Sequence, residues 1–307
     1  MPDEKVLQVA ILIWGCAFCA IAALCIFLSS NYDREKRWYL ILMESFASML
    51  LLMDAMAHIF SGYPGVPGSV MVRISSFLVF LLSDVVLLCF HIYVCVYLFS
   101  KRERRTLKRV KAGYVIAAAG AAFVVISQFT HWYYYIDGDN CYHRAPLYIM
   151  SILLPAAGMF IDLTLLLQYK KRVSRKLLFS MLSCIVLPAV AAAVQAFWYG
   201  MSLIDFFVGI SMIIMFIVTM TELNQEMYQL ISREGKIKER LEIATILNKC
   251  IAELISGEDE DAAISNLLCI ISGYFDGDRS YIVQIDEKRN VCTNTYEYAM
   301  NGVTAEK

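Results

Sequence analysis

Ionisable side chains that could act as acids, bases or proton carriers lie inside long apolar stretches of this 307-residue chain. The side chains concerned are Glu44, Asp54, His58, Asp84, His91 and Asp162. An ionisable group in a bilayer costs a few kcal/mol or more unless it faces the bundle interior and finds a partner. Each of these residues is therefore a candidate for binding or proton transfer, and ordinary interhelical hydrogen bonding is the alternative.

Their spacing groups them by helix face. Asp54 and His58 are four residues apart, and Asp84 and His91 are seven apart, so each pair shares one face of a helix. A rise of about 1.5 Å per residue places Asp54 in the outer third of the membrane, Asp84 near the middle, and His91 and Asp162 in the inner half. The pattern predicts a ligand site or a protonation relay between the second, third and fifth membrane helices.

Seven apolar stretches would position these groups. The stretches are Val6–Leu28, Trp38–Phe60, Val70–Phe99, Gly113–Phe129, Leu147–Tyr169, Leu177–Trp198 and Leu203–Thr221. Most reach the ~20 residues that a helix needs to cross a bilayer, and the fourth and seventh are slightly short. Apolar residues make up 59% of the chain and charged residues 18%, against about 45–50% and about 25% in soluble domains. The composition predicts a multi-pass membrane protein.

The connections between these stretches alternate in charge. Lysine and arginine are frequent in Asn31–Arg37, Lys101–Lys111 and Lys170–Lys176. Ser61–Ser69 and Tyr199–Ser202 hold no charged residue. Because basic connections stay on the cytoplasmic side, the alternation predicts an external N-terminus, seven crossings and a cytoplasmic C-terminus.

The longest external connection combines aromatic rings with carboxylates. Trp132 and Tyr134 would lie at the membrane surface, and Asp137 follows them. Such rings usually form an interfacial belt. The alternative is a lid over an outward pocket, where rings and carboxylates bind a small amphipathic or cationic ligand. The segment from Asp137 to Asn140 lacks the distal glutamate of a calcium loop, so no metal site is predicted.

From Glu222 to Ser256 charge is frequent and proline is absent. A seam with alternating spacings of three and four comprises Leu223, Met227, Leu230, Glu234, Ile237, Leu241, Ala244, Asn248, Ile251 and Ile255. This heptad pattern predicts a parallel two-helix coiled coil and therefore a homodimer; a single helix packed on a following domain is the alternative. Glu234, Gly235 and Asn248 interrupt the regular pattern and are candidate switch positions.

The last residues predict a short acidic hinge, a helix and a β-hairpin. The expected elements are a hinge at Gly257–Asp261, a helix at Ala262–Tyr274, and strands at Ser280–Ile285 and Val291–Tyr298. So few elements cannot bury enough surface to be stable alone, so we expect either a docking partner or a longer protein. The fold class is mainly α: a transmembrane bundle (1–221), a cytoplasmic coiled-coil helix (222–256) and an incomplete α+β segment (257–307).

Two motifs in the last segment resemble the opening of a GAF domain. They are Asp278-Arg279-Ser280-Tyr281-Ile282-Val283-Gln284-Ile285-Asp286, and Asn294-Thr295-Tyr296-Glu297-Tyr298 followed by Gly302-Val303-Thr304. Tyr298 stands where tryptophan is common. The likeness is to bacterial signalling proteins that end in a GGDEF-type diguanylate cyclase or a histidine kinase. The membrane half, on residues 127–137 and 142–144, also resembles the seven-helix sensor regions ahead of GGDEF domains in gut Firmicutes.

The resemblance implies a dimeric signal receptor in a bacterial cytoplasmic membrane, with an unknown small-molecule ligand. It also implies an output domain outside residues 1–307, because these residues hold no GGDEF motif and no kinase motif. No catalytic residue or cofactor is predicted, and the tail has no basic face for nucleic acid. An ion- or proton-coupled transporter is the alternative function. A retinal pump is excluded because no apolar stretch carries a lysine for a Schiff base.

Overall fold

The computed structural model describes residues 2–29, 33–197, 202–256, 259–287 and 289–300. Their contacts divide the chain into two units, Met1–Gln225 and Glu226–Lys307. The helix α8 runs from the first unit into the second. Each unit is described by itself.

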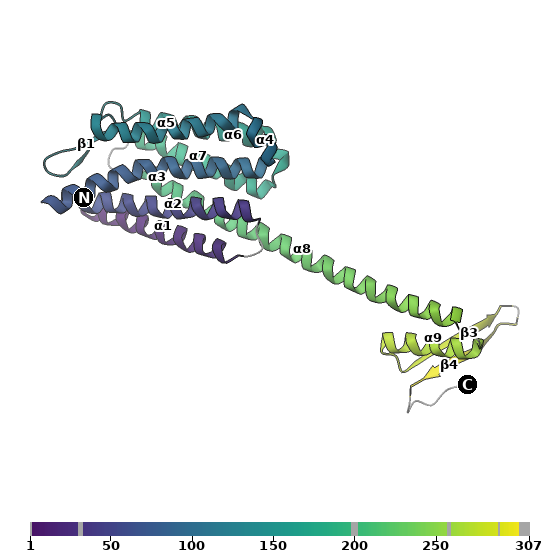
Figure 1. The fold of residues 1–307 in the computed structure, drawn as a ribbon. Helices are drawn as coiled ribbons and strands as arrows, with labels where there is room; N and C mark the ends of the chain where they lie inside the picture. The colour runs from purple at the N-terminus through teal and green to yellow at the C-terminus, as the bar shows by residue number, and fades with distance from the viewer. Residues whose placement is uncertain (1, 30–32, 198–201, 257–258, 288, 301–307) are drawn as a thin grey trace. The chain divides into compact units, whose positions relative to one another are not determined.

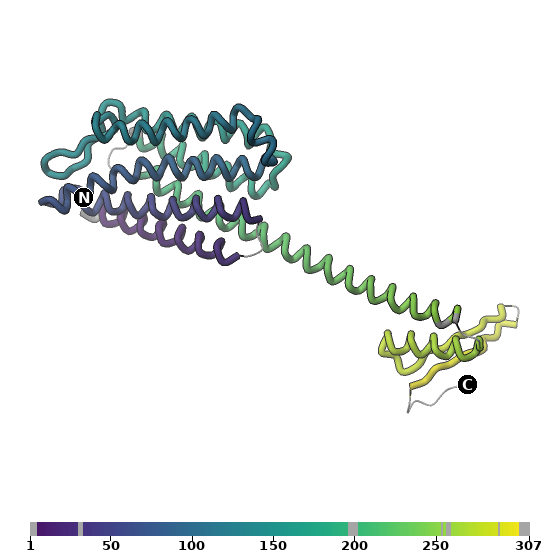
Figure 2. Tube along the Cα trace, in the orientation of Figure 1, coloured from purple at the N-terminus to yellow at the C-terminus, as the bar shows by residue number. Residues whose placement is uncertain are grey.

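Seven helices among the described residues are long and apolar enough to cross a membrane. They are α1 (Pro2–Leu28), α2 (Arg34–Phe60), α3 (Val66–Leu98), α5 (Lys108–Thr130), α6 (Met150–Tyr169), α7 (Arg175–Phe197) and α8 (Leu203–Ser256). In the first unit they pack side by side (Figures 1 and 2). The predicted class, a mainly α multi-pass membrane protein, is confirmed.

Helix bounds differ from the sequence prediction where polar residues join an apolar stretch. The fourth spanning helix is longer than expected because α5 takes in the basic turn that begins at Lys108. The connection that begins at Lys101 contains a helix of its own, α4 (Lys101–Thr106), which the apolar and basic pattern does not predict. A 3-10 turn, Lys170–Arg172, follows α6.

The connections separate to two ends of the bundle. At one end, strands β1 (Tyr134–Ile136) and β2 (Tyr142–Arg144) form an antiparallel hairpin. The side chain of Asn140, in the turn of this hairpin, donates a hydrogen bond to the carbonyl of Tyr63 (2.9 Å) between α2 and α3. At the other end the basic connections meet, where Arg104 pairs with Glu35 (2.8 Å). The basic connections and the β1–β2 hairpin therefore lie at opposite ends of the bundle, as the alternation of charge along the sequence predicts.

Every spanning helix contributes buried apolar side chains to the core of the first unit. Fully buried side chains include Leu12, Met43, Leu50, Tyr93, Leu166, Met181 and Met215. Lipid tails are as apolar as these side chains, so the helices are held by close packing and interhelical polar contacts rather than by the hydrophobic effect.

The second unit contains the end of α8, helix α9 (Glu260–Phe275) and strands β3 (Arg279–Asp286) and β4 (Val291–Ala299). The strands pair antiparallel with a bulge between Ile282 and Val283. Ser280 anchors the hairpin to α9 by donating a hydrogen bond to the carbonyl of Leu268 (2.8 Å). The predicted helix and hairpin are therefore present, with bounds that differ by one or two residues. Residues 257–258 of the expected hinge and 302–304 of the second motif lie outside the described residues.

Candidate ligand cavity and buried polar groups

A cavity of about 1220 Å³ lies inside the first unit. Its walls come from all seven spanning helices and are mostly apolar; Phe80, Met159, Phe160, Leu163 and Ile185 are among the lining side chains. The volume exceeds the range of about 300–1,000 Å³ that is typical of small-molecule sites. Polar groups are few and gather in patches on this apolar wall.

Two carboxyl groups form the most acidic patch. Asp54 on α2 and Asp205 on the first turn of α8 are both buried, and their carboxyls lie directly against each other. Ser202 donates a hydrogen bond to Asp54 Oδ1 (3.1 Å), while Asp54 Oδ2 has no donor among the described residues. Sequence reasoning did not single out Asp205, although an aspartate at the third position of an apolar stretch was visible.

His58 extends this patch toward α1. Its Nε2 lies 2.5 Å from Gln8 Nε2 and 3.3 Å from the hydroxyl of Ser202. Asp54 and His58 share a helix face, as their spacing predicted. Their partners come from α1 and α8, however, and not from the third and fifth spanning helices, α3 and α6.

Asp84 forms a second acidic position on the cavity wall, on α3. It is 7% exposed and has no hydrogen-bond partner among the described residues. Its carboxyl packs against Gly120 of α5, where an added Cβ would come within 2.8 Å of Asp84 Oδ2. Burial, with the Asp84 carboxylate as a second cause, raises the pKa of Tyr133, in the connection between α5 and β1, to about 12. Tyr133 therefore stays a neutral phenol beside the carboxyl.

His91 and Asp162 form a separate buried pair that does not line the cavity. His91 Nδ1 lies 2.5 Å from Asp162 Oδ1, and His91 Nε2 lies 3.0 Å from the carbonyl of Val110. A carbonyl can only accept, so Nε2 carries a proton, and a second proton lies between Nδ1 and the carboxyl. The pair joins α3, α5 and α6, and its geometry is that of an interhelical crosslink.

Two glycines of α5 make room for the polar residues of α3. Asp84 and His91, seven residues apart, pack against Gly120 and Gly113, which are also seven apart. Small residues let membrane helices approach closely, so this pairing brings α3 and α5 together. The matched spacing is visible in the sequence, although it is no signal within either helix alone.

The aromatic residues of the external connection differ in burial. Tyr134 is buried and stacks on Phe80 of α3 (ring centroids 5.3 Å apart) and on Tyr142 (5.5 Å). Trp132 is 38% exposed and packs at a tilt against Phe123. Tyr134 therefore closes one end of the bundle, whereas the exposure of Trp132 agrees with the interfacial belt.

Asp137 organises the turn of the β1–β2 hairpin and does not line the cavity. Its Oδ1 accepts hydrogen bonds from the backbone N–H groups of Cys141 (2.8 Å) and Asp139 (3.0 Å), and its Oδ2 lies 2.7 Å from His143 Nε2. The backbone hydrogen bond from Cys141, followed by the one from His143, lowers the pKa of Asp137 below its ordinary value. The structure thus gives this residue a local structural role.

We expect Asp137→Ala to expose the amides of Cys141 and Asp139, because both lose their acceptor. Their hydrogen exchange should accelerate several-fold. Since the folded-state pKa is lowered, the contribution is complete above the ordinary value near 3.8 and is lost as pH falls through the lower folded value. Exchange of the hairpin amides measures the effect, with Asp139→Ala as the control. Unchanged protection in Asp137→Ala would contradict this role.

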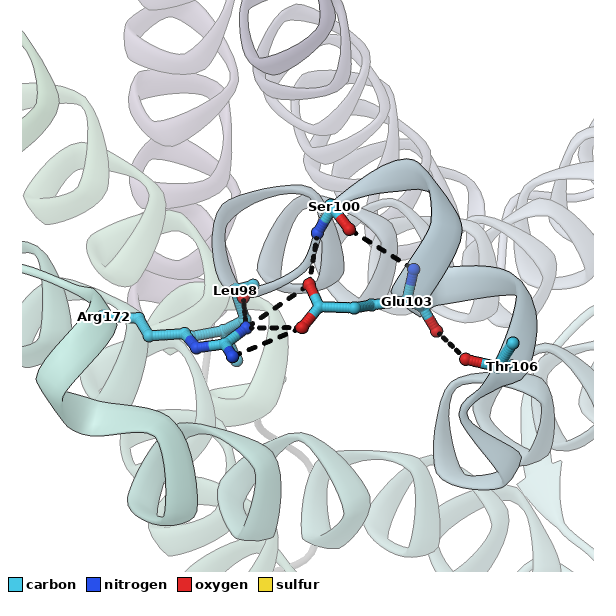
Figure 3. Close-up of polar contacts among 5 residues, drawn as sticks. All are labelled: Leu98, Ser100, Glu103, Thr106 and Arg172. Carbon is cyan, nitrogen blue, oxygen red and sulfur yellow. Dashed lines mark hydrogen bonds and ion pairs between the residues drawn. The ribbon is translucent and has the colours of Figure 1, made fainter.

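Glu103 links two connections at the end of the bundle where the basic residues lie (Figure 3). Its carboxylate accepts from the backbone N–H of Ser100 (2.9 Å), which closes a capping box, and from Arg172 Nη1 (3.2 Å). Arg172 also donates to the carbonyl of Leu98 (2.8 Å). The connection between α3 and α5 is thereby tied to the end of α6. The Ser-x-x-Glu spacing of the capping box could have predicted α4.

The candidate switch residues lie on the exposed part of α8. Glu234, Gly235 and Asn248 are all exposed, and α8 continues through them without a break. Seam side chains on either side, Leu230, Ile237 and Leu241, are also exposed. An apolar stripe of this kind on a water-exposed helix is suited to pairing with another helix.

No family model, curated protein or solved structure matches this chain. The cavity, the buried polar groups and the continuous helix α8 are therefore the features that bear on function.

Proposed function

We propose that this chain is the sensory part of a membrane signal receptor. The observation that carries the proposal is the position of Asp205: it lies on the wall of the cavity and also in the first turn of α8. A ligand that changes the contact between Asp54 and Asp205 would shift α8 against α2. Because α8 is one continuous helix to Ser256, such a shift can travel along it.

The exposed seam of α8 supports a parallel homodimer as the form that receives this movement. A second copy would cover the stripe with its own identical stripe, as in coiled coils. Glu234 and Asn248 both occupy seam positions, where polar residues lower stability and fix the register of the helices. Such a marginal pair of helices can adopt two arrangements that differ little in free energy.

The hairpin of the second unit supports a GAF-like regulatory role. Tyr281, Ile285 and Val291 are exposed apolar residues on its strands, and they suit further packing in a larger sheet. In this proposal the regulated output domain, a diguanylate cyclase or a histidine kinase, lies outside residues 1–307. The basic end of the bundle and the second unit face the cytoplasm of a bacterial cell.

We expect the double variant Glu234→Leu, Asn248→Leu to lock one signalling state. A continuous apolar seam would stabilise one helix pairing, so output should become constant and independent of the stimulus. Disulfide formation by an added Ile237→Cys should also become more complete. The measurement uses the full-length protein in membranes. Glu239→Leu with Lys249→Leu, on the outer face of the helix, is the control. A double variant that responds like the parent protein would count against the relay.

A proton- or ion-coupled transporter remains the second candidate, and the Asp54–Asp205 pair supports it. Two carboxyls in contact inside a membrane cavity can take up and release a proton or cation. Proton flux in proteoliposomes that disappears in Asp205→Asn would favour transport. Flux no greater than in empty liposomes would favour the receptor.

A further inference from the structure

We propose that the cavity binds an amphipathic organic amine whose ammonium group lies against the Asp54–Asp205 carboxyl pair, at Asp54 Oδ2, and whose apolar body lies against α3 and α6. This inference rests on the proposed function of the cavity as a ligand site. It adds the chemical class of the ligand and the residues that select it.

The first step is the charge of the carboxyl pair. Two buried carboxyls in direct contact cannot both be ionised at low cost, so one proton joins them in a hydrogen bond and the pair keeps one negative charge. Ser202 supplies one hydrogen bond to Asp54 Oδ1, and Asp54 Oδ2 is left without a donor in the described part of the chain. An ammonium group has three N–H donors and one positive charge. It can therefore donate to the unpartnered oxygen and neutralise the one negative charge of the pair.

The second step is the placement of the protein's own cations on the cavity wall. Lys5 donates to the carbonyl of Ser61 (3.1 Å), and the guanidinium of Arg144 lies over the ring of Tyr148 (4.6 Å). His58 makes its contacts with Gln8 and Ser202. None of the contacts named here joins one of these cations to the carboxyl of Asp205, and Asp54 Oδ2 has no donor among the described residues, so an external cation can bind at that oxygen.

The third step is the character of the remaining wall. Phe80, Phe160 and Leu163 provide an apolar surface large enough for a ring system, and aromatic faces also attract cations. Asp84, the other carboxyl without a partner on this wall, adds further negative charge. An anion would meet three carboxyls and is therefore disfavoured.

An inorganic divalent cation fits less well. No group of three or more His, Cys, Asp or Glu side chains with metal-binding geometry occurs among the described residues. Two carboxyls and one hydroxyl also fall short of the roughly six to eight oxygens that calcium takes. The apolar wall would in addition have no role in holding a bare ion.

The test compares three probes with the same indole body and different charge: tryptamine, tryptophol and indole-3-acetate. Equilibrium binding is measured on the full chain in phosphatidylcholine nanodiscs, with empty nanodiscs as the background. We expect saturable binding of tryptamine, at least about tenfold weaker binding of neutral tryptophol, and no binding of the anion. Asp205→Asn and Asp54→Asn should each weaken tryptamine binding at least about tenfold. Glu35→Gln, at the opposite end of α2, should leave it unchanged.

Three results would overturn the proposal: equal binding of tryptamine and tryptophol, tryptamine binding that survives both Asp54→Asn and Asp205→Asn, or no saturable binding of tryptamine. The first two leave a receptor for uncharged ligands intact. Either aspartate variant that folds is sufficient for the comparison. Failure of the receptor function is seen separately: tryptamine would bind as expected, yet disulfide formation along α8 would not change when it is added.

Discussion

Replacing Gly113 with alanine is expected to destabilise the membrane unit by about 2–4 kcal/mol, because the new methyl group would occupy the space of a buried ring. A Cβ at this position would lie 2.3 Å from Cε1 and Nε2 of His91. Real Cβ atoms do not approach other heavy atoms so closely, so the ring or the helix must move.

The ring of His91 cannot move without losing its partners. Asp162 holds one nitrogen at 2.5 Å and the carbonyl of Val110 holds the other at 3.0 Å. Asp162 is fully buried and its Oδ2 already lacks a partner among the described residues, so displacement of the ring would leave neither carboxyl oxygen paired within them. An unpaired charge in a buried site is one of the costliest defects a single substitution can produce.

Equilibrium unfolding of the reconstituted protein measures this effect. Gly158→Ala is the matched control, because the nearest atom to its Cβ would be a terminal methyl of Leu87 at 3.1 Å, and the methyl of Ile116 would lie at an ordinary contact distance of 3.8 Å. A second control adds His91→Ala. Once the ring is absent, Gly113→Ala should cost little more, so the two substitutions should be strongly non-additive. Additive effects, or a Gly113→Ala protein as stable as Gly158→Ala, would show that the ring does not depend on this glycine.

The sequence was sufficient for the number and type of the spanning helices because these depend on local properties. Length and apolarity decide whether a stretch crosses a bilayer, and basic residues decide which connections share one side. The hairpin that ends in Ala299 was predictable for the same reason, since alternation of side chains along a strand is local. The bounds changed where polar residues, as at Lys108, joined an apolar stretch, and α6 begins at Met150 and not at the predicted Leu147.

The site itself depended on packing between distant segments. The sequence placed Asp54 and Asp162 in one expected site, but Asp54 lines the cavity and Asp162 does not. The contact between Asp54 and Asp205 joins residues far apart in the chain, and no periodicity within one helix can report it. The spacing of Gly113 and Gly120 could have predicted that α5 packs against α3. A glycine in a membrane helix often marks the place where a neighbouring helix brings a bulky or polar side chain close.

Replacing Glu44 with methionine is expected to stabilise the membrane unit, by about 1–3 kcal/mol, although it removes an ionisable group. Glu44 lies on α2, is fully buried, and neither oxygen of its carboxyl has a hydrogen-bond partner of normal geometry among the described residues. Its polar surroundings include the thiols of Cys19 and Cys184, which are weak donors. Methionine has a similar volume and needs no hydrogen bonds.

Two controls separate the effect of the missing hydrogen bonds on stability from the effect of side-chain shape. Glu44→Gln keeps the shape and still needs partners, so it should gain little, and Glu35→Met changes a partly exposed glutamate that pairs with Arg104. Unfolding of the four proteins under one condition gives the comparison. A destabilised Glu44→Met protein would mean that the carboxyl is satisfied in the membrane. A stabilised protein that no longer responds to its stimulus would show instead that the carboxyl is kept for function, because an unsatisfied acid is retained against stability only where the protein uses it.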